Sequence, residues 1–128
     1  MISSLSVVRP HLTQLSQNYH SLCIQAVLIQ VNQGLESSKL GAHPDDVLSL
    51  AKEMRTLSSI QLLGLMSIPP FDQPAKPYFA DLRHLRDEIF KTLDIPLPFL
   101  SMGMSADFDD AISEGATHIR IGTAIFGK

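Results

Sequence analysis

The chain has 128 residues, a length typical of one domain. Hydrophobic residues make up 45% of it and charged residues 18%, so the composition excludes a disordered or low-complexity chain. The formal net charge of −3 excludes the strongly basic surface of a typical nucleic-acid-binding domain, and no nucleic-acid partner is expected.

The compartment is predicted from the cysteine content and from the apolar stretches. The single cysteine, Cys23, has no partner for an internal disulfide and is typical of a reducing compartment. No apolar stretch approaches the roughly 20 residues of a membrane span. The N-terminus lacks the basic start and long apolar run of a secretory signal. We therefore predict a soluble cytoplasmic protein with no membrane partner.

Apolar runs and amphipathic stretches alternate along the first half of the chain. A helix is predicted at the start from the helical spacing of Leu5, Val8, Leu12 and Leu15. The β-branched run 23–31 predicts a buried strand, which a polar loop follows. Pro44 and the two aspartates after it predict the N-terminus of a second helix. Its apolar face comprises Val47, Leu48, Leu50, Ala51, Met54 and Leu57.

The second half of the chain continues the alternation. The run 60–68 predicts a strand, and Gly64 within it indicates a close backbone approach. A helix over 77–93 is predicted from an apolar stripe comprising Phe79, Leu82, Leu85, Ile89, Phe90 and Leu93. Strands are predicted at 97–102 and 118–123. The short helix between them is expected to have Ser105 as its N-cap and Gly115 at its end.

Strands separated by helices run parallel with right-handed crossovers, so the predicted fold class is α/β. Two architectures fit this order: a small open three-layer sheet, or part of a (β/α)₈ barrel, whose complete form needs about 250 residues. A partial barrel leaves two bare parallel edges and one uncovered sheet face. The barrel interpretation therefore requires either further chain or a partner subunit.

Two strand ends near the C-terminus are suited to binding an anion. Ser105 opens a predicted helix, where free backbone N–H groups and a hydroxyl meet. Gly122 ends the next strand and lets backbone N–H groups approach a ligand closely. In (β/α)₈ enzymes a phosphate often lies between the loops after the last two strands, so we predict one phosphate site here. The alternative is that Ser105 is only a helix cap and Gly122 only a turn residue.

Arg120 interrupts an apolar run, and alternation with Ile119 places it on the opposite face of the sheet, beside His118. If the isoleucines pack against the helices, that face is the barrel interior. A guanidinium there either contacts a ligand near the phosphate or pairs with a neighbouring acid. His118 is expected to be a structural residue, and Met66 a core residue or a surface under a flat ring. The histidines show no spacing typical of metal ligands, so no metal site is predicted.

Three segments together resemble the pyridoxal-phosphate homeostasis protein family: QVN with ESSKLG at 30–41, GLMSIPP at 64–70, and LSMGMSADFDDAISEGATHIRIGTAIFG at 100–127. This family is similar to the barrel domain of bacterial alanine racemase. The resemblance implies a TIM-like (β/α)₈ barrel that binds pyridoxal 5′-phosphate. Its members are described as carriers and regulators of vitamin B6 and amino-acid pools, without established catalytic turnover.

The resemblance also implies roles for individual residues. The phosphate is held at positions that match Ser101, Ser105, Gly122 and Thr123. The arginine that matches Arg120 faces the pyridine nitrogen and keeps it unprotonated, and the position of Met66 lies near the cofactor.

One departure from the family concerns the lysine that forms a Schiff base with the cofactor. In the family it lies on the first strand, ahead of the segment that this sequence matches. The lysines of this chain do not match that position: Lys39, Lys52, Lys76, Lys91 and Lys128. Residues 1–128 are therefore expected to form the C-terminal half of the barrel domain and to bind the cofactor non-covalently, without catalysis.

Two other interpretations stay open. An alanine-racemase-type enzyme needs a tyrosine as second base, and neither Tyr19 nor Tyr78 lies in a matching motif. A half-barrel interaction module is completed either by a complementary chain that carries the N-terminal half or by self-association.

Overall fold

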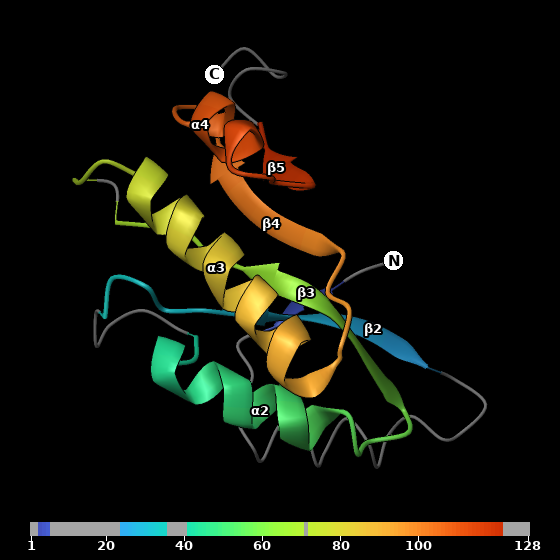
Figure 1. The fold of residues 1–128 in the computed structure, drawn as a ribbon. Coiled ribbons are helices and arrows are strands. Elements are labelled where there is room, and N and C mark those ends of the chain that lie inside the picture. Colours follow the sequence, from blue (N-terminus) through green and yellow to red (C-terminus); the bar gives the residue numbers. More distant parts are fainter. Residues whose placement is uncertain (1–2, 6–23, 36–40, 71, 122–128) are drawn as a thin grey trace.

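The computed structural model describes residues 3–5, 24–35, 41–70 and 72–121. They form a parallel five-stranded sheet in the order β1-β2-β3-β4-β5 (Figure 1). The strands are β1 (Ser3–Leu5), β2 (Gln25–Gln30), β3 (Ile60–Met66), β4 (Phe99–Met104) and β5 (His118–Arg120). A sheet whose spatial order follows the sequence is typical of a (β/α)₈ barrel, whereas a doubly wound sheet reverses its order in the middle.

From β2 onward, a helix lies between successive strands, as the sequence predicts. A 3₁₀ turn, η1 (Pro44–Asp46), leads into α2 (Val47–Met54), and α3 (Lys76–Leu93) and α4 (Phe108–Ser113) follow. The predicted apolar face of α2 is confirmed, because Val47, Leu50, Ala51 and Met54 are buried. None of the described helices is long and apolar enough to cross a bilayer.

Three details of the predicted elements are wrong. Leu5 lies in a strand that pairs with β2, rather than in a helix. The rest of that predicted helix lies outside the described residues, as does Cys23. Phe90 is 51% exposed, because it lies beside the core-facing Ile89 on the outer side of α3. Finally, β4 begins at Phe99 and not at Leu97, since Pro98 has no N–H to donate to a neighbouring strand.

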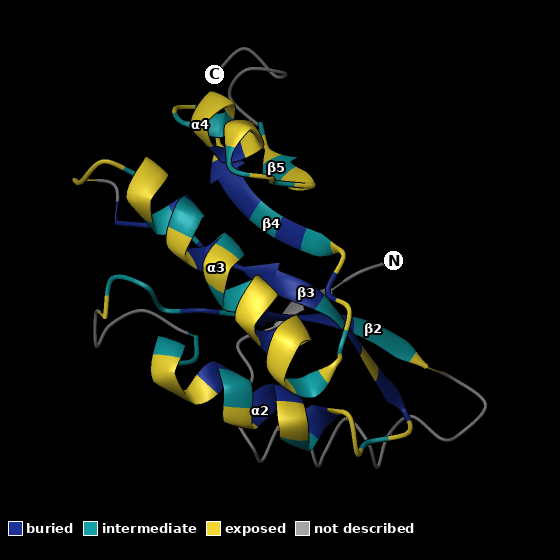
Figure 2. Ribbon diagram, in the orientation of Figure 1, coloured by how far each residue is buried: buried dark blue, intermediate teal, exposed yellow. Residues whose placement is uncertain are grey.

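The hydrophobic core lies between one face of the sheet and the helices. It includes Val27 and Ile29 of β2, Leu65 of β3 and Leu100 of β4, which are fully buried against residues of α2 and α3. Figure 2 shows buried residues along β3 and β4 and exposed residues on the outer sides of the helices. Each buried side chain of this size contributes about 1.5–3 kcal/mol. Leu28 and Met66 are also buried but do not belong to this cluster.

Strands β3 and β4 approach each other closely at Gly64, as the sequence predicts. A Cβ atom on Gly64 would lie 1.9 Å from the carbonyl oxygen of Phe99. The pairing then continues in register from Leu65 opposite Leu100 to Met66 opposite Ser101. The close approach at Gly64 therefore belongs to the same stretch of pairing that places Met66, at the end of β3, opposite Ser101.

Candidate functional site

A small hollow lies at the carboxyl ends of β3, β4 and β5. We call it the carboxyl-end hollow; its lining includes Met66, Ser67, Ser101, Gly103, Met104 and Arg120. Its volume of about 10 Å³ is close to that of one water molecule. Functional sites of (β/α)₈ barrels are built at this end of the strands. A larger ligand would lie over the strand ends rather than inside the hollow.

Three residues predicted from the sequence meet at this hollow: Met66, Ser101 and Arg120. Strand pairing brings them together, because Met66 lies opposite Ser101 and Arg120 lies opposite Met104. Ile119 packs against the core cluster on the helix side of the sheet, so its neighbour Arg120 belongs to the other face. The predicted side of Arg120 is therefore confirmed.

Arg120 is exposed, and within the described part of the chain no carboxylate lies within 4.0 Å of its guanidinium. The described residues thus do not support the alternative of a structural ion pair. His118, on the same face, is also exposed. Its ring contacts Phe99 edge to face at 4.8 Å, and its Nδ1 lies 2.9 Å from the hydroxyl of Thr117. These contacts fit a structural role for His118.

Ser105 does not occupy the predicted position. It lies half-buried in the turn between β4 and α4, outside the lining of the hollow, and Asp107 is the N-cap of α4. The carboxylate of Asp107 accepts a hydrogen bond of 2.7 Å from the N–H of Met104. The N–H of Asp107 donates in return to the carbonyl of Met104 at 3.0 Å. These two bonds close the turn and delay the start of the helix to Phe108, so the prediction of Ser105 as N-cap is wrong.

The remaining predicted site residues, Gly122 and Thr123, lie outside the described residues, as does Lys39. Tyr78 lies at the start of α3, away from the carboxyl-end hollow, and its hydroxyl donates to Oε1 of Gln73.

Sequence reasoning missed Ser67. This residue is only 2% exposed, and its hydroxyl has no hydrogen-bond partner among the described residues. Its backbone N–H donates to the carbonyl of Ser101, and the residue belongs to the lining of the hollow. In the sequence Ser67 is one more serine after an apolar run, and nothing there signals that its hydroxyl is buried and unpaired.

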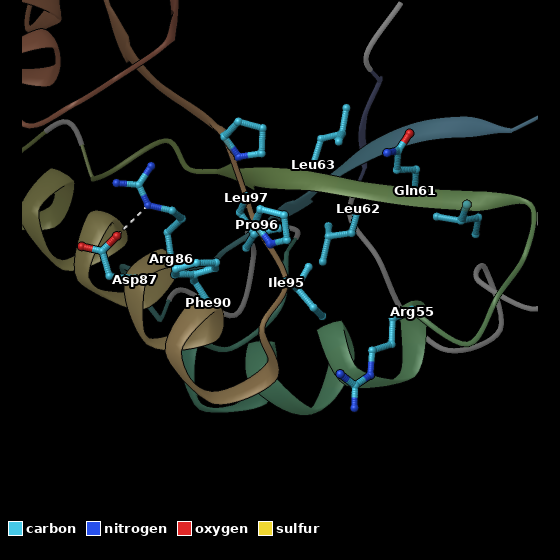
Figure 3. Close-up of a pocket in the computed structure, with 12 residues that line it drawn as sticks. Arg55, Gln61, Leu62, Leu63, Arg86, Asp87, Phe90, Ile95, Pro96 and Leu97 are labelled. Atoms are coloured by element: carbon cyan, nitrogen blue, oxygen red, sulfur yellow. Dashed lines mark hydrogen bonds and ion pairs between the residues drawn. The ribbon is translucent and has the colours of Figure 1, made fainter.

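A much larger cavity than the carboxyl-end hollow lies elsewhere (Figure 3). It has a volume of about 600 Å³ and is lined by the amino-terminal part of β3, the segment Ile95–Pro98 and Phe90. At one side Arg86 pairs with Asp87 at 2.8 Å. This cavity lies at the amino ends of the strands, where conservation and packing in barrels serve stability rather than chemistry. We therefore take the carboxyl-end hollow as the candidate site despite its small volume.

Comparison with known proteins identifies relatives of the chain. Among curated proteins, it is 47% identical over 108 residues to the pyridoxal phosphate homeostasis protein of Aquifex aeolicus, covering 82% of this chain and 47% of that protein. The protein of that name from Pseudomonas aeruginosa is 45% identical over 101 residues, with 79% of this chain and 44% of that protein covered. For the one from Homo sapiens the identity is 38% over 109 residues, covering 80% and 40%. The chain spans less than half the length of these relatives.

Solved structures agree with the fold. PipY of Synechococcus elongatus without PLP has a TM-score of 0.88 at 30% identity, covering 98% of this chain and 61% of that chain. The structure of PipY with PLP bound has a TM-score of 0.81 at 30% identity, covering 98% and 60%. Alanine racemase of Corynebacterium glutamicum shares the fold, with a TM-score of 0.74 at 17% identity over 96% of this chain and 35% of that chain.

These neighbours have TIM-barrel folds, which confirms the predicted class of parallel β/α units of a TIM-like barrel. The predicted resemblance to the pyridoxal-phosphate homeostasis proteins is confirmed by the curated relatives. The chain also matches the family described as "Alanine racemase, N-terminal domain" over residues 2–128. The chain belongs to the alanine racemase N-terminal domain family.

Proposed function

We propose that the chain binds pyridoxal 5′-phosphate over the carboxyl-end hollow, without covalent attachment or catalysis, as part of vitamin B6 and amino-acid homeostasis. The observation that carries this proposal is the meeting of Met66, Ser101 and Arg120 at the ends of three neighbouring strands. The name of the curated relatives and the PLP-bound structure of PipY support it.

The residues of the hollow suit this ligand chemically. Among the described residues, the lining holds one cation, Arg120, together with the hydroxyl-bearing Ser101, and no carboxylate. Such a donor set favours an anionic ligand and an unprotonated ring nitrogen. The thioether of Met66 offers a soft, polarisable surface to a flat ring.

Each residue has a separate role in this proposal. Arg120 donates a hydrogen bond to the pyridine nitrogen, while Ser101, Ser105, Gly122 and Thr123 hold the phosphate. Bound pyridoxal phosphate supplies an electron sink, and a guanidinium at the ring nitrogen makes that sink weaker than a carboxylate partner does.

The proposal extends to the organisation of the protein. Residues 1–128 form the C-terminal half of a barrel domain, and β1 and β5 are the edge strands of the described sheet. Unpaired parallel edges favour pairing with further strands. Further chain of the same protein, a complementary chain that carries the N-terminal half and its lysine, or a second copy of this chain would cover them. Co-purification with such a half chain, as a compact species in small-angle scattering, tests this part.

The binding proposal is tested with pyridoxine 5′-phosphate, which has no aldehyde and so does not react with lysines. We expect saturable binding in equilibrium dialysis, and Arg120→Ala weakens it by about tenfold or more, since it removes a hydrogen bond from a charged donor. Arg55→Ala is the matched control, because Arg55 is an exposed arginine at the other end of the sheet whose described contact is a hydrogen bond to the carbonyl of Leu93. Equal effects of the two substitutions, or no saturable binding by the unmodified chain, would refute the proposal.

A further inference from the structure

The cavity of about 600 Å³, which we call the amino-end cavity, follows an edge of β3 (Figure 3). Its lining includes the four consecutive residues 60–63 on one side and the segment 95–98 before β4 on the other. Successive side chains of a strand point to opposite faces, as Figure 3 shows for Leu62 and Leu63. A cavity that contacts both therefore lies along the edge of the strand and not over one of its faces.

On the side of this cavity, residues 60–63 have no neighbouring strand among the described residues. Pairing of β3 with β4 begins at Gly64 opposite Phe99, beyond residues 60–63. No backbone hydrogen bond of the described loops joins 60–63 to 95–98. Pro96 and Pro98 contribute to this gap, because neither has an N–H to donate.

The hydrogen bonds around β3 identify the backbone groups that face the cavity. The carbonyl of Ser59 accepts from the N–H of Gln25 in β2 at 2.9 Å. Since the backbone groups of successive strand residues point to opposite neighbours, those of Ile60 and Leu62 point away from β2 and toward the cavity. The N–H of Ile60 donates to the carbonyl of Leu57 at 3.4 Å. None of the backbone hydrogen bonds of the described loops and turns reaches the carbonyl of Ile60 or either backbone group of Leu62.

The charged side chains of the lining already have partners. Arg86 pairs with Asp87 at 2.8 Å, and Arg55 donates to the carbonyl of Leu93 at 3.0 Å. In contrast, the ring of Phe90 is 51% exposed. The cavity therefore offers open contacts to backbone groups and apolar side chains rather than to a charge. An extended peptide supplies both of these, whereas a small apolar anion does not supply the backbone groups.

We infer that residues 60–63 form a docking edge for a partner protein, which adds an extended segment with alternating apolar side chains as a short strand inside the amino-end cavity. N–H groups of the segment donate to the carbonyls of Ile60 and Leu62, and one of its carbonyls accepts from the N–H of Leu62. In this mode of recognition, main-chain hydrogen bonds give affinity and alternate side chains give specificity. Phe90 packs against the apolar side chains of the segment. The inference is independent of the proposed function, since the amino-end cavity and the carboxyl-end hollow share no described lining residue.

The test uses the full chain, isotope-labelled for NMR, and a blocked pentapeptide of alternating threonine and valine as the probe. We expect saturable binding and slower hydrogen exchange at the amide of Leu62 when the peptide is bound. A strand bonds to one neighbour through alternate residues, so methylation of one alternate set of peptide nitrogens should weaken binding about tenfold or more. Methylation of the other set is the matched control and should leave the affinity unchanged. Equal affinities of the two methylated peptides, or no saturable binding of the unmethylated one, would overturn the inference.

Two exposed apolar residues provide a second comparison. Phe90→Ala should weaken binding of the peptide about threefold or more, because it removes the ring from the cavity wall. Ile112→Ala is the matched control, since Ile112 is 52% exposed on α4 and does not line the cavity. Equal losses for the two substitutions would contradict the docking edge.

Hydrogen exchange of the chain without peptide tests whether the edge is open. The amide of Leu62 should exchange faster than that of Leu65, which lies opposite Leu100 of β4. Equal protection of the two amides at every protein concentration would show that the hydrogen bond is made within the chain. Protection of Leu62 that rises with protein concentration would assign the edge to a second copy of the chain. Either result would overturn the inference.

Discussion

Replacing Gly103 with alanine tests the geometry of the site most directly. Gly103 lines the carboxyl-end hollow and has a φ of +106°, a conformation that side chains other than glycine rarely adopt. A Cβ atom there would lie 2.6 Å from Cβ of Ala111 and 3.2 Å from Cγ2 of Ile119. Since Ala111 is in α4 and fully buried, its methyl group cannot rotate away.

The expected loss of stability has two parts. The left-handed backbone costs an alanine about 1–2 kcal/mol, and overpacking costs about 1–3 kcal/mol. We therefore expect Gly103→Ala to lower the free energy of unfolding by about 2–5 kcal/mol, measured by urea denaturation. Gly115→Ala is the matched control: its φ is +98°, but the contact of its Cβ with Arg83 is an ordinary 3.5 Å. It should lose only the backbone part, about 1–2 kcal/mol.

A double-mutant cycle isolates the overpacking. Ala111→Gly removes the opposing methyl and costs about 1 kcal/mol of helix propensity by itself. In combination with Gly103→Ala it should recover about 1–3 kcal/mol relative to the sum of the single effects. If the two substitutions prove additive within about 0.5 kcal/mol, α4 does not approach β4 as described, and the reasoning about the hollow fails.

Two further predictions concern the neighbouring strand and turn. Gly64→Ala should lower the free energy of unfolding by more than about 3 kcal/mol, because the backbone oxygen of Phe99 lies 1.9 Å from the added Cβ. The measurement is urea denaturation, and a loss below about 1 kcal/mol would contradict this close approach. Asp107→Ala should lower the free energy of unfolding by about 1 kcal/mol, because it removes the acceptor for the N–H of Met104. Asp107→Asn, which keeps an acceptor oxygen, should recover most of that loss. Asp109→Ala serves as the control. A loss of stability for Asp109→Ala as large as that for Asp107→Ala would show that the hydrogen bond to Met104 is not the source of the loss.

Much of the fold could be predicted because its signals are local. Alternation within 118–121 was enough to place Ile119 on the helix side and Arg120 on the other face, since successive side chains of a strand point to opposite faces. The same kind of signal failed at Phe90, which lies at the border of the apolar stripe of its helix. A residue at that border faces either the core or the solvent, and its spacing from the other apolar residues is nearly the same in both cases. It failed at Ser105 because two capping residues, Ser105 and Asp107, compete within one turn.

The alternation of helices and strands, the parallel sheet and the face of Arg120 could be predicted, since they follow from periodicity and turn chemistry over a few residues. That Met66, Ser101 and Arg120 share one hollow could not, because their meeting depends on the register between three strands of the folded sheet. The fold also leaves the buried hydroxyl of Ser67 without a hydrogen-bond partner among the described residues. Hydrogen bonding of a buried side chain depends on segments distant in sequence, and no local pattern carries that information.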